Sequence, residues 1–150
     1  MDYQDLKNIE RELTAALKEE YSFYQQLYIT LDKQRDLIKF DHDAHLLDLF
    51  AEVERYRSRI KTSEARISTL KEKNPQAFRM VSVLPEVKKL INSITTLIKK
   101  NQDIVRECEG YCEGRYNRIQ QELGELKNSS KIMQYLSEGV PAPQFVDGKK

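Results

Sequence analysis

Two histidines and two aspartates within residues 41–45 form the densest group of side chains able to do chemistry. Imidazole nitrogens and carboxylate oxygens are ligands for divalent metals such as zinc. His42 and His45 are only three residues apart, and no second cluster rich in histidine or cysteine exists to complete a coordination shell. We interpret the segment as a polar connection between helices, with Asp41 and Asp43 as candidate N-caps, and predict no metal.

Other signatures of catalysis are missing from the sequence. It has no glycine-rich phosphate loop, no Gly-x-Ser-x-Gly and none of the Glu-x-x-His pairs of di-iron bundles. Cys108 and Cys112 are one helical turn apart, which suits small buried apolar residues better than a disulfide. We predict that the chain is not an enzyme and uses no cofactor; an enzyme built on residues 41–45 is our least favoured hypothesis.

The composition is typical of long helices. The 150 residues suit one domain, 33% of them are charged, and there are five glycines and four prolines. A net charge of +1 gives no basic excess for nucleic acid. No apolar run approaches the ~18 residues of a membrane span, and the acidic N-terminus does not resemble a signal peptide. We therefore expect a cytoplasmic protein without nucleic-acid binding or membrane insertion.

Residues 85–126 are the stretch that the rest of the chain should cover. Apolar residues recur there every three or four positions, and residues 86–126 contain no proline. They are Val87, Leu90, Ile94, Leu97, Ile104, Cys108, Tyr111, Ile119, Leu123 and Leu126. This spacing predicts one long helix with an apolar face, about 60 Å in length. Such a helix needs partners along that face.

Two earlier stretches have the same periodicity. The first predicts a helix over residues 2–39, capped by Asp2. The second predicts a helix that follows residues 41–43 and ends at Asn74, because a residue that precedes proline is disfavoured in a helix. Asn74 can also cap a short helix near residues 75–80, with its proline at the first helical position.

Four polar residues that bear on the packing lie at positions where the apolar periodicity predicts buried core residues. We expect Glu20 to be satisfied by a tyrosine hydroxyl or by a basic residue on another helix. Arg57 and Glu64 either pair with opposite charges on a facing helix or, for Arg57, lay the side-chain stem along the seam. Asn101 is a register-fixing buried asparagine, a rim residue or a client contact; the sequence leaves these alternatives open.

The predicted fold is all-α: three long helices in an antiparallel coiled-coil-like bundle over residues 1–128, with the longest helix last. Residues 129–150 should form a short amphipathic segment, capped by Ser130, and a flexible tail. The third long helix is longer than the second, so its C-terminal end should extend past its partners. The candidate partner-binding residues are Arg115, Ile119, Leu123, Leu126, Ile132, Met133, Tyr135, Leu136 and Phe145.

This layout resembles the FlgN-type flagellar export chaperones. Residues 37–47 resemble the family's leucine, aspartate, leucine pattern at the first helix junction, and residues 54–60 resemble its arginine-bearing second helix. Residues 97–105, which include Asn101, resemble its asparagine-containing third helix. Residues 144–148 resemble its aromatic-x-x-x-glycine tail end.

The resemblance implies a function. Such proteins bind hook–filament junction proteins in the cytoplasm, prevent their premature assembly and deliver them to the flagellar export apparatus, with the client held by the C-terminal helix and tail. A chaperone of this kind should be a monomer or a weak homodimer. The alternative is a non-enzymatic coiled-coil adaptor or tether whose apolar stripe seals a stable homodimer. Neither the client nor its affinity follows from the sequence.

Overall fold

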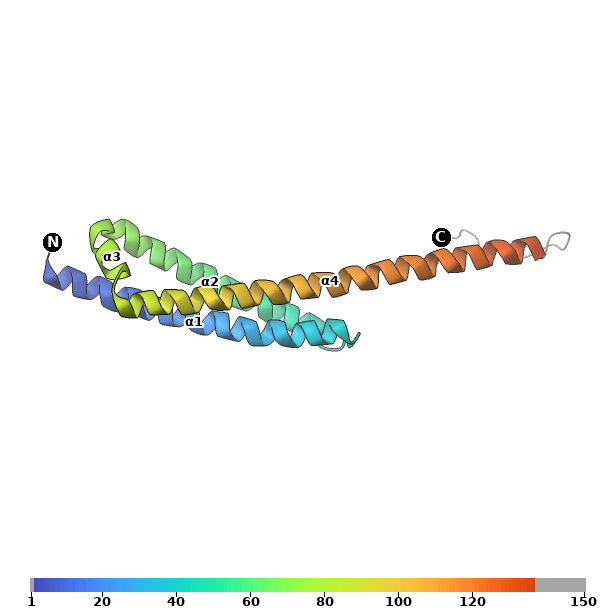
Figure 1. Cartoon of the computed structure of the whole chain (residues 1–150), viewed down its shortest axis with the longest axis horizontal. Coiled ribbons are helices and arrows are strands. Elements are labelled where there is room, and N and C mark those ends of the chain that lie inside the picture. The colour runs from blue at the N-terminus through green and yellow to red at the C-terminus, as the bar shows by residue number, and fades with distance from the viewer. Residues whose placement is uncertain (1, 137–150) are drawn as a thin grey trace. The chain divides into compact units, whose positions relative to one another are not determined.

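The described part of the chain is all-helical, as the sequence predicts. A computed structural model describes the backbone of residues 2–136 and the side-chain environment of residues 2–128. It contains α1 (Tyr3–Lys39), α2 (Leu46–Lys73), α3 (Pro75–Ser82) and α4 (Pro85–Leu136) (Figure 1). The chain divides into two compact units, Met1–Glu109 (unit 1) and Gly110–Lys150 (unit 2). We describe each unit by itself.

The predicted caps of α1 and α3 are confirmed. The Asp2 carboxylate accepts a hydrogen bond from the backbone N–H of Gln4 at 3.4 Å. The Asn74 side chain accepts one from the N–H of Ala77 at 3.1 Å, and Pro75 follows it at the start of α3. These bonds satisfy N–H groups that lack a partner within the helix. The α3 helix continues to Ser82, slightly beyond the predicted end.

The start of α2 differs from the prediction. His45, not Asp41 or Asp43, precedes the first helical residue, and it makes no capping hydrogen bond with its side chain. The connection bends through two left-handed residues, Asp41 at φ 57° and His45 at φ 66°. This path leaves the backbone oxygen of Asp43 to accept a hydrogen bond from the N–H of Leu46 at 3.2 Å. The prediction of an aspartate N-cap is therefore wrong.

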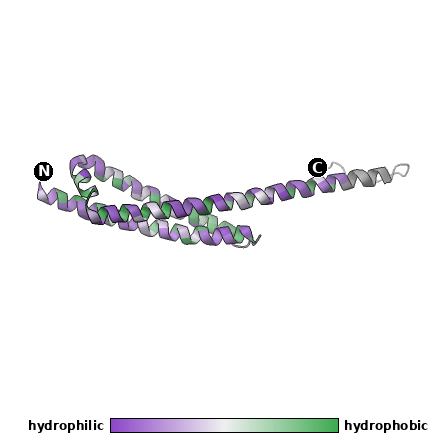
Figure 2. Cartoon of the chain, viewed as in Figure 1, coloured by the Kyte–Doolittle hydropathy of each residue, from purple (hydrophilic) through white to green (hydrophobic). Residues whose placement is uncertain are grey.

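One apolar cluster joins all four helices within unit 1. The apolar faces that form it alternate along each helix with polar positions (Figure 2). Its buried members are Ile9, Leu13, Leu17, Leu70, Ala77, Val81, Val87 and Ile94. Burying such side chains is the main favourable contribution to folding. The rhythm of α1 and the first part of α4 thus predicted the core correctly.

Polar contacts join α1 to α2 at two levels. The Ser63 hydroxyl donates a hydrogen bond to the backbone oxygen of Ala16 at 3.4 Å, and both residues are buried. Farther along α1, the Thr30 hydroxyl lies 3.0 Å from a carboxylate oxygen of Glu52. Small side chains at the first level allow the two backbones to approach closely.

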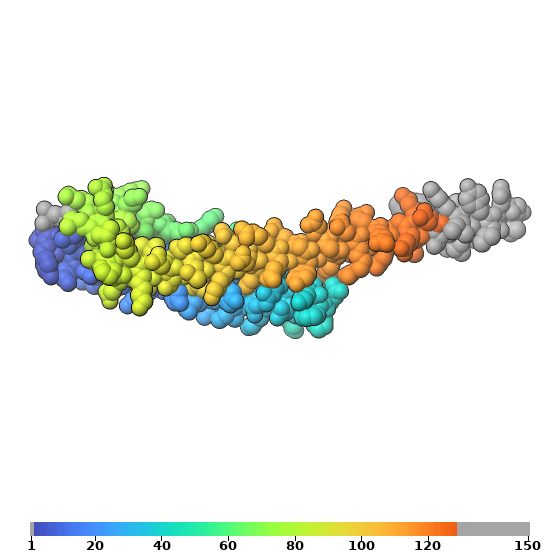
Figure 3. Space-filling view, viewed as in Figure 1, coloured from blue at the N-terminus to red at the C-terminus, as the bar shows by residue number. Residues whose placement is uncertain are grey.

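The first part of α4 packs directly along α1, as the face in Figure 3 shows. The side-chain N–H of Asn101 donates a hydrogen bond to the backbone oxygen of Tyr24 at 3.4 Å. About three turns farther along α1, Arg35 forms an ion pair with Glu107 at 3.0 Å and also contacts two aspartates of its own helix. The hydrogen bond that Arg35 donates to the Glu107 carboxylate is the largest of the causes that raise the pKa of Arg35.

The α4 helix does not break where we expected a change of element. It runs without interruption through residues 128–130 to Leu136, so Ser130 does not begin a new helix. Asparagine and serine have modest helix propensities, but they keep the backbone N–H and carbonyl groups that a helix needs. The predicted flexible tail, residues 137–150, lies outside the described residues.

Candidate functional site

Unit 2 presents a row of exposed apolar side chains along α4. The exposed fractions are 47% for Ile119, 54% for Leu123 and 66% for Leu126. Tyr116 is also exposed, whereas Arg115 is half-buried and takes part in interactions of its own. Large aliphatic side chains in water along one helix face are typical of a surface that binds another protein.

These residues share one face because of their spacing. At 3.6 residues per turn, Arg115, Ile119, Leu123 and Leu126 lie within an arc of about 80°. We call these four residues the α4 stripe. Four of the nine predicted binding residues are therefore brought together on one surface.

The remaining predicted binding residues are not open to the same test. Ile132, Met133, Tyr135 and Leu136 belong to α4, but their side chains lie outside the described residues. Phe145 lies outside them altogether. Their part in binding stays a prediction.

Three glycines accompany the α4 stripe in unit 2. A Cβ atom built on Gly110, Gly114 or Gly124 would meet no atom within 4 Å. No close packing within the described residues thus requires glycine at these positions. Each glycine weakens the helix by about 1 kcal/mol relative to alanine, which makes this part of α4 easier to open.

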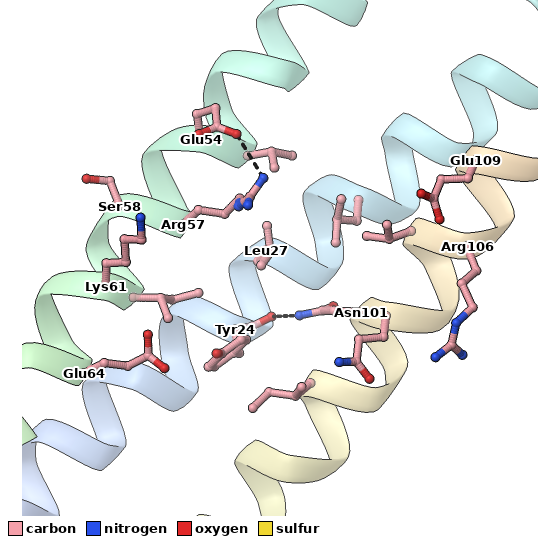
Figure 4. Close-up of a pocket in the computed structure, with 16 residues that line it drawn as sticks. Tyr24, Leu27, Glu54, Arg57, Ser58, Lys61, Glu64, Asn101, Arg106 and Glu109 are labelled. Carbon is pink, nitrogen blue, oxygen red and sulfur yellow. Dashed lines mark hydrogen bonds and ion pairs between the residues drawn. The ribbon is translucent and has the colours of Figure 1, made fainter. Parts of the chain in front are cut away.

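Unit 1 contains a second candidate surface, which the sequence did not reveal. A groove of about 810 Å³ has α1 as its floor and α2 and α4 as its two walls (Figure 4). Its apolar lining comes from Leu27, Leu31, Val53, Ile60, Ile98 and Val105. A smaller hollow of about 360 Å³ lies against Leu13, Leu17, Ile67, Phe78 and Ile91. Glu64 lines both, so the hollows adjoin at its side chain.

Two acidic side chains meet at this junction. Glu20 of α1 is only 6% exposed, and its carboxylate interacts electrostatically with Glu64 of α2. Burial first, and then the negative charge of Glu64, raises the pKa of Glu20 to about 7. Burial and the same two carboxylates raise the pKa of Tyr24 to about 12. The junction therefore resists negative charge and would favour a cation or a hydrogen-bond donor.

The expected partners of these acids are not present. Among the described residues, neither Glu20 nor Glu64 makes a hydrogen bond or an ion pair. Arg66 pairs instead with Glu19 at 3.6 Å, two positions from Glu64 on α2 and one position from Glu20 on α1. Arg57 pairs within α2 with Glu54, so it does not bridge to a facing helix. The expected partner of Glu20 and the expected pairing of Arg57 and Glu64 with a facing helix are therefore wrong, because the register of α1 against α2 places Glu20 beside Glu64. The alternative in which the stem of Arg57 lies along the seam stays a prediction.

Asn101 is a buried seam residue, which rules out the rim position. It is 5% exposed and lines the larger hollow, with its side chain directed toward α1 (Figure 4). Its amide N–H is bonded to Tyr24, but Oδ1 has no hydrogen-bond partner among the described residues. A buried acceptor without a donor destabilises the fold by about 1–3 kcal/mol. Asn101 Oδ1 is therefore a second acceptor in this groove to which a bound partner could donate a hydrogen bond.

The 41–45 connection offers no cluster of ligands. Among residues 2–136, no three His, Cys, Asp or Glu side chains come together as a metal site would require. The His45 imidazole lies 3.6 Å from the Asp48 carboxylate, and both side chains are exposed.

Cys108 is buried as predicted, but Cys112 is exposed. Nor do the described helices include one long and apolar enough to span a membrane.

Comparison of the chain with protein families, characterised proteins and solved structures finds no match. The candidate surfaces therefore depend on the geometry described above. Two features stand out: an apolar stripe in unit 2, and a groove in unit 1 that holds unpaired acceptors.

Proposed function

We propose that this chain is a non-enzymatic, cytoplasmic type III flagellar export chaperone of the FlgN type. Its clients would be hook–filament junction proteins, and its destination the flagellar export apparatus. The observation that carries the binding role is the exposed α4 stripe of unit 2, where Ile119, Leu123 and Leu126 are each about half exposed or more. The resemblance of the sequence to the family supports the identity of the client.

The proposal includes an antiparallel, coiled-coil-like arrangement in unit 1. The contacts support it, because Ala16 pairs with Ser63 whereas Thr30, later in α1, pairs with Glu52, earlier in α2. Such a bundle would be a rigid carrier for the binding helix, with helix packing typical of small bundles. The other predicted binding residues, from Ile132 to Phe145, would extend the binding region beyond the stripe.

Binding would follow the helix-in-groove mode. An amphipathic client helix would lay its apolar face against the α4 stripe and remove those side chains from water. The burial would stabilise the complex by about 25 cal/mol per Å² of apolar area, less the cost of ordering both partners. Arg115, at one end of the stripe, would guide orientation more than overall affinity.

The test is size-exclusion chromatography with light scattering, on the full chain alone and with a purified junction subunit. We expect a stoichiometric complex that is weakened or lost when the chain is truncated after Asn128 and when Leu123→Asp is introduced. Gln121→Asp is the matched control, because it places the same charge on the opposite, polar side of this exposed helix. The control should bind the client normally.

Two results would overturn the proposal. The first is a chain that ignores every junction subunit. The second is a tight homodimer that is indifferent to both client and truncation, which would favour the adaptor or tether. Equal binding by Leu123→Asp and Gln121→Asp would move the site away from the α4 stripe.

A further inference from the structure

The smaller hollow of unit 1 lies where all four helices meet. Each helix contributes to its lining, with Glu20 from α1, Glu64 from α2, Phe78 from α3 and Ile91 from the first part of α4. Its volume of about 360 Å³ is at the lower end of the range for small-molecule sites. A space of this size suits a small molecule, since a helix of another protein is about 10 Å across.

The charged side chains that line this hollow are both acidic. Glu20 is 6% exposed, and Glu64 is exposed and adds a second carboxylate toward solvent. Neither carboxylate makes a hydrogen bond or an ion pair among the described residues. No lysine or arginine lines the smaller hollow, whereas basic side chains do line the larger groove. A buried carboxylate without a partner destabilises the fold, so a cation bound here would offset that cost.

The remaining chemistry of the hollow favours an organic cation over a metal ion. Leu13 and Leu17 line it and precede Glu20 by about two turns and one turn on the same face of α1. A ligand whose charge meets Glu20 would therefore lay an apolar body against these leucines. Among residues 2–136, no three His, Cys, Asp or Glu side chains come together as a metal site would require.

We propose that this hollow binds a small aliphatic ammonium ion. The ammonium group donates a hydrogen bond to the Glu20 carboxylate, and the alkyl chain lies against Leu13, Leu17 and Phe78. The exposed Glu64 adds a second negative charge that attracts the ligand. A primary ammonium carries three N–H donors and no acceptor, which matches a lining whose charged groups are acceptors. The hollow shares no residue with the α4 stripe, so this inference is independent of the proposed function.

The test is a titration of the full chain with n-pentylammonium chloride, followed by the NMR chemical shifts of the backbone amides. The pH is about 8, because the pKa of Glu20 is about 7 and an aliphatic amine, like that of lysine, is still protonated there. We expect saturable shifts at residues that line the hollow, with a Kd of about 1 mM or tighter, since the ligand has few atoms.

Glu20→Gln should weaken the binding of n-pentylammonium about tenfold or more, because it removes a charged hydrogen bond. The matched control is Glu12→Gln, an exposed glutamate of the same helix outside the hollow, which should bind as the wild type does. Glu64→Gln should weaken binding by a smaller factor, since this carboxylate is exposed. The neutral n-pentanol has the same apolar body, and should bind about tenfold more weakly than the ammonium.

Three results would overturn the inference. The first is the absence of saturable shifts up to about 20 mM ligand, far above the expected Kd. The second is equal affinity of Glu20→Gln and Glu12→Gln for n-pentylammonium, and the third is equal affinity of the wild type for n-pentanol.

A last comparison separates a free amine from a lysine side chain of another protein. N-acetyl-lysine amide carries the same ammonium group, but its two amide groups would lose water on entering the apolar part of the hollow. It should therefore bind more weakly than n-pentylammonium. Tighter binding of the lysine derivative would assign the hollow to a protein side chain and overturn the assignment to a small free amine.

Discussion

The two parts of α4 have the same sequence rhythm and opposite surroundings. In unit 1, Val87, Ile94 and Ile104 are at most 6% exposed, because α1, α2 and α3 pack against them. In unit 2, Ile119 and Leu126 continue the rhythm but are 47% and 66% exposed. The spacing of apolar residues therefore shows which face of a helix is apolar, and not whether that face is covered.

The comparison also separates stability from binding. A covered position contributes to the free energy of unfolding, whereas an exposed apolar position contributes mainly to whatever binds there. Substitutions at equivalent positions of the two parts should have different effects. The four predictions below are ordered by their expected effect on stability.

The largest effect is expected for Ile94→Asp. This change buries a carboxylate in the cluster that joins the helices of unit 1, so it should lower the free energy of unfolding by about 3 kcal/mol or more and abolish cooperative folding. Urea denaturation followed by circular dichroism measures it. A variant that unfolds with the wild-type midpoint would show that this part of α4 is not core.

A smaller effect, with a pH dependence, is expected for Glu20→Gln. The pKa of Glu20 is raised from 4.5 to about 7 in the folded chain, so the folded state binds more protons than the unfolded state between these values. The free energy of unfolding therefore falls as the pH rises through that window. Glutamine removes the charge, and should raise stability by about 2 kcal/mol above pH 7 while changing little below pH 4.5.

The measurement is a series of urea denaturations at several pH values. Glu12→Gln is the matched control, since Glu12 is an exposed residue of the same helix. It should leave the pH dependence as it is in the wild type. Loss of stability in Glu20→Gln above pH 7 would mean that the carboxylate has a favourable partner.

Gly114→Ala should strengthen the helix of unit 2. Open space surrounds the position, so alanine adds no clash and removes backbone freedom, a gain of about 0.5–1 kcal/mol for the local helix. Amide hydrogen exchange should show increased protection around residue 114. Unchanged or reduced protection would argue that this stretch of α4 has a different local structure.

The smallest effect on stability is expected for the α4 stripe. Ile119→Asp makes the same chemical change as Ile94→Asp, but at an exposed position, and should alter the free energy of unfolding by no more than about 0.5 kcal/mol. Leu123→Asp and Leu126→Asp should likewise leave the thermal midpoint within a few degrees. All three should prevent client binding. A loss of stability as large as that of Ile94→Asp would show that the chain covers this stripe itself.

Much of the local structure could be predicted because it depends on nearby residues. Asp2 and Asn74 cap helices through bonds to N–H groups two or three residues away, so their spacing was sufficient. The N-cap of α2 could not be predicted from spacing alone. Asp41 and His45 have left-handed backbone conformations, and the resulting path places His45 at the N-cap. The exposure of Cys112 was also missed, since a seam position does not guarantee a neighbour.

The sequence by itself determined that the chain is helical, which face of each helix is apolar and where α1 and α3 begin. These depend on propensity, spacing and caps within a few residues. The tertiary structure alone decided that Glu20 meets Glu64 and not a cation, and that Asn101 is buried with Oδ1 unpaired. The physical reason is register: which charges and which apolar faces come level depends on how two helices align, and no single helix encodes that.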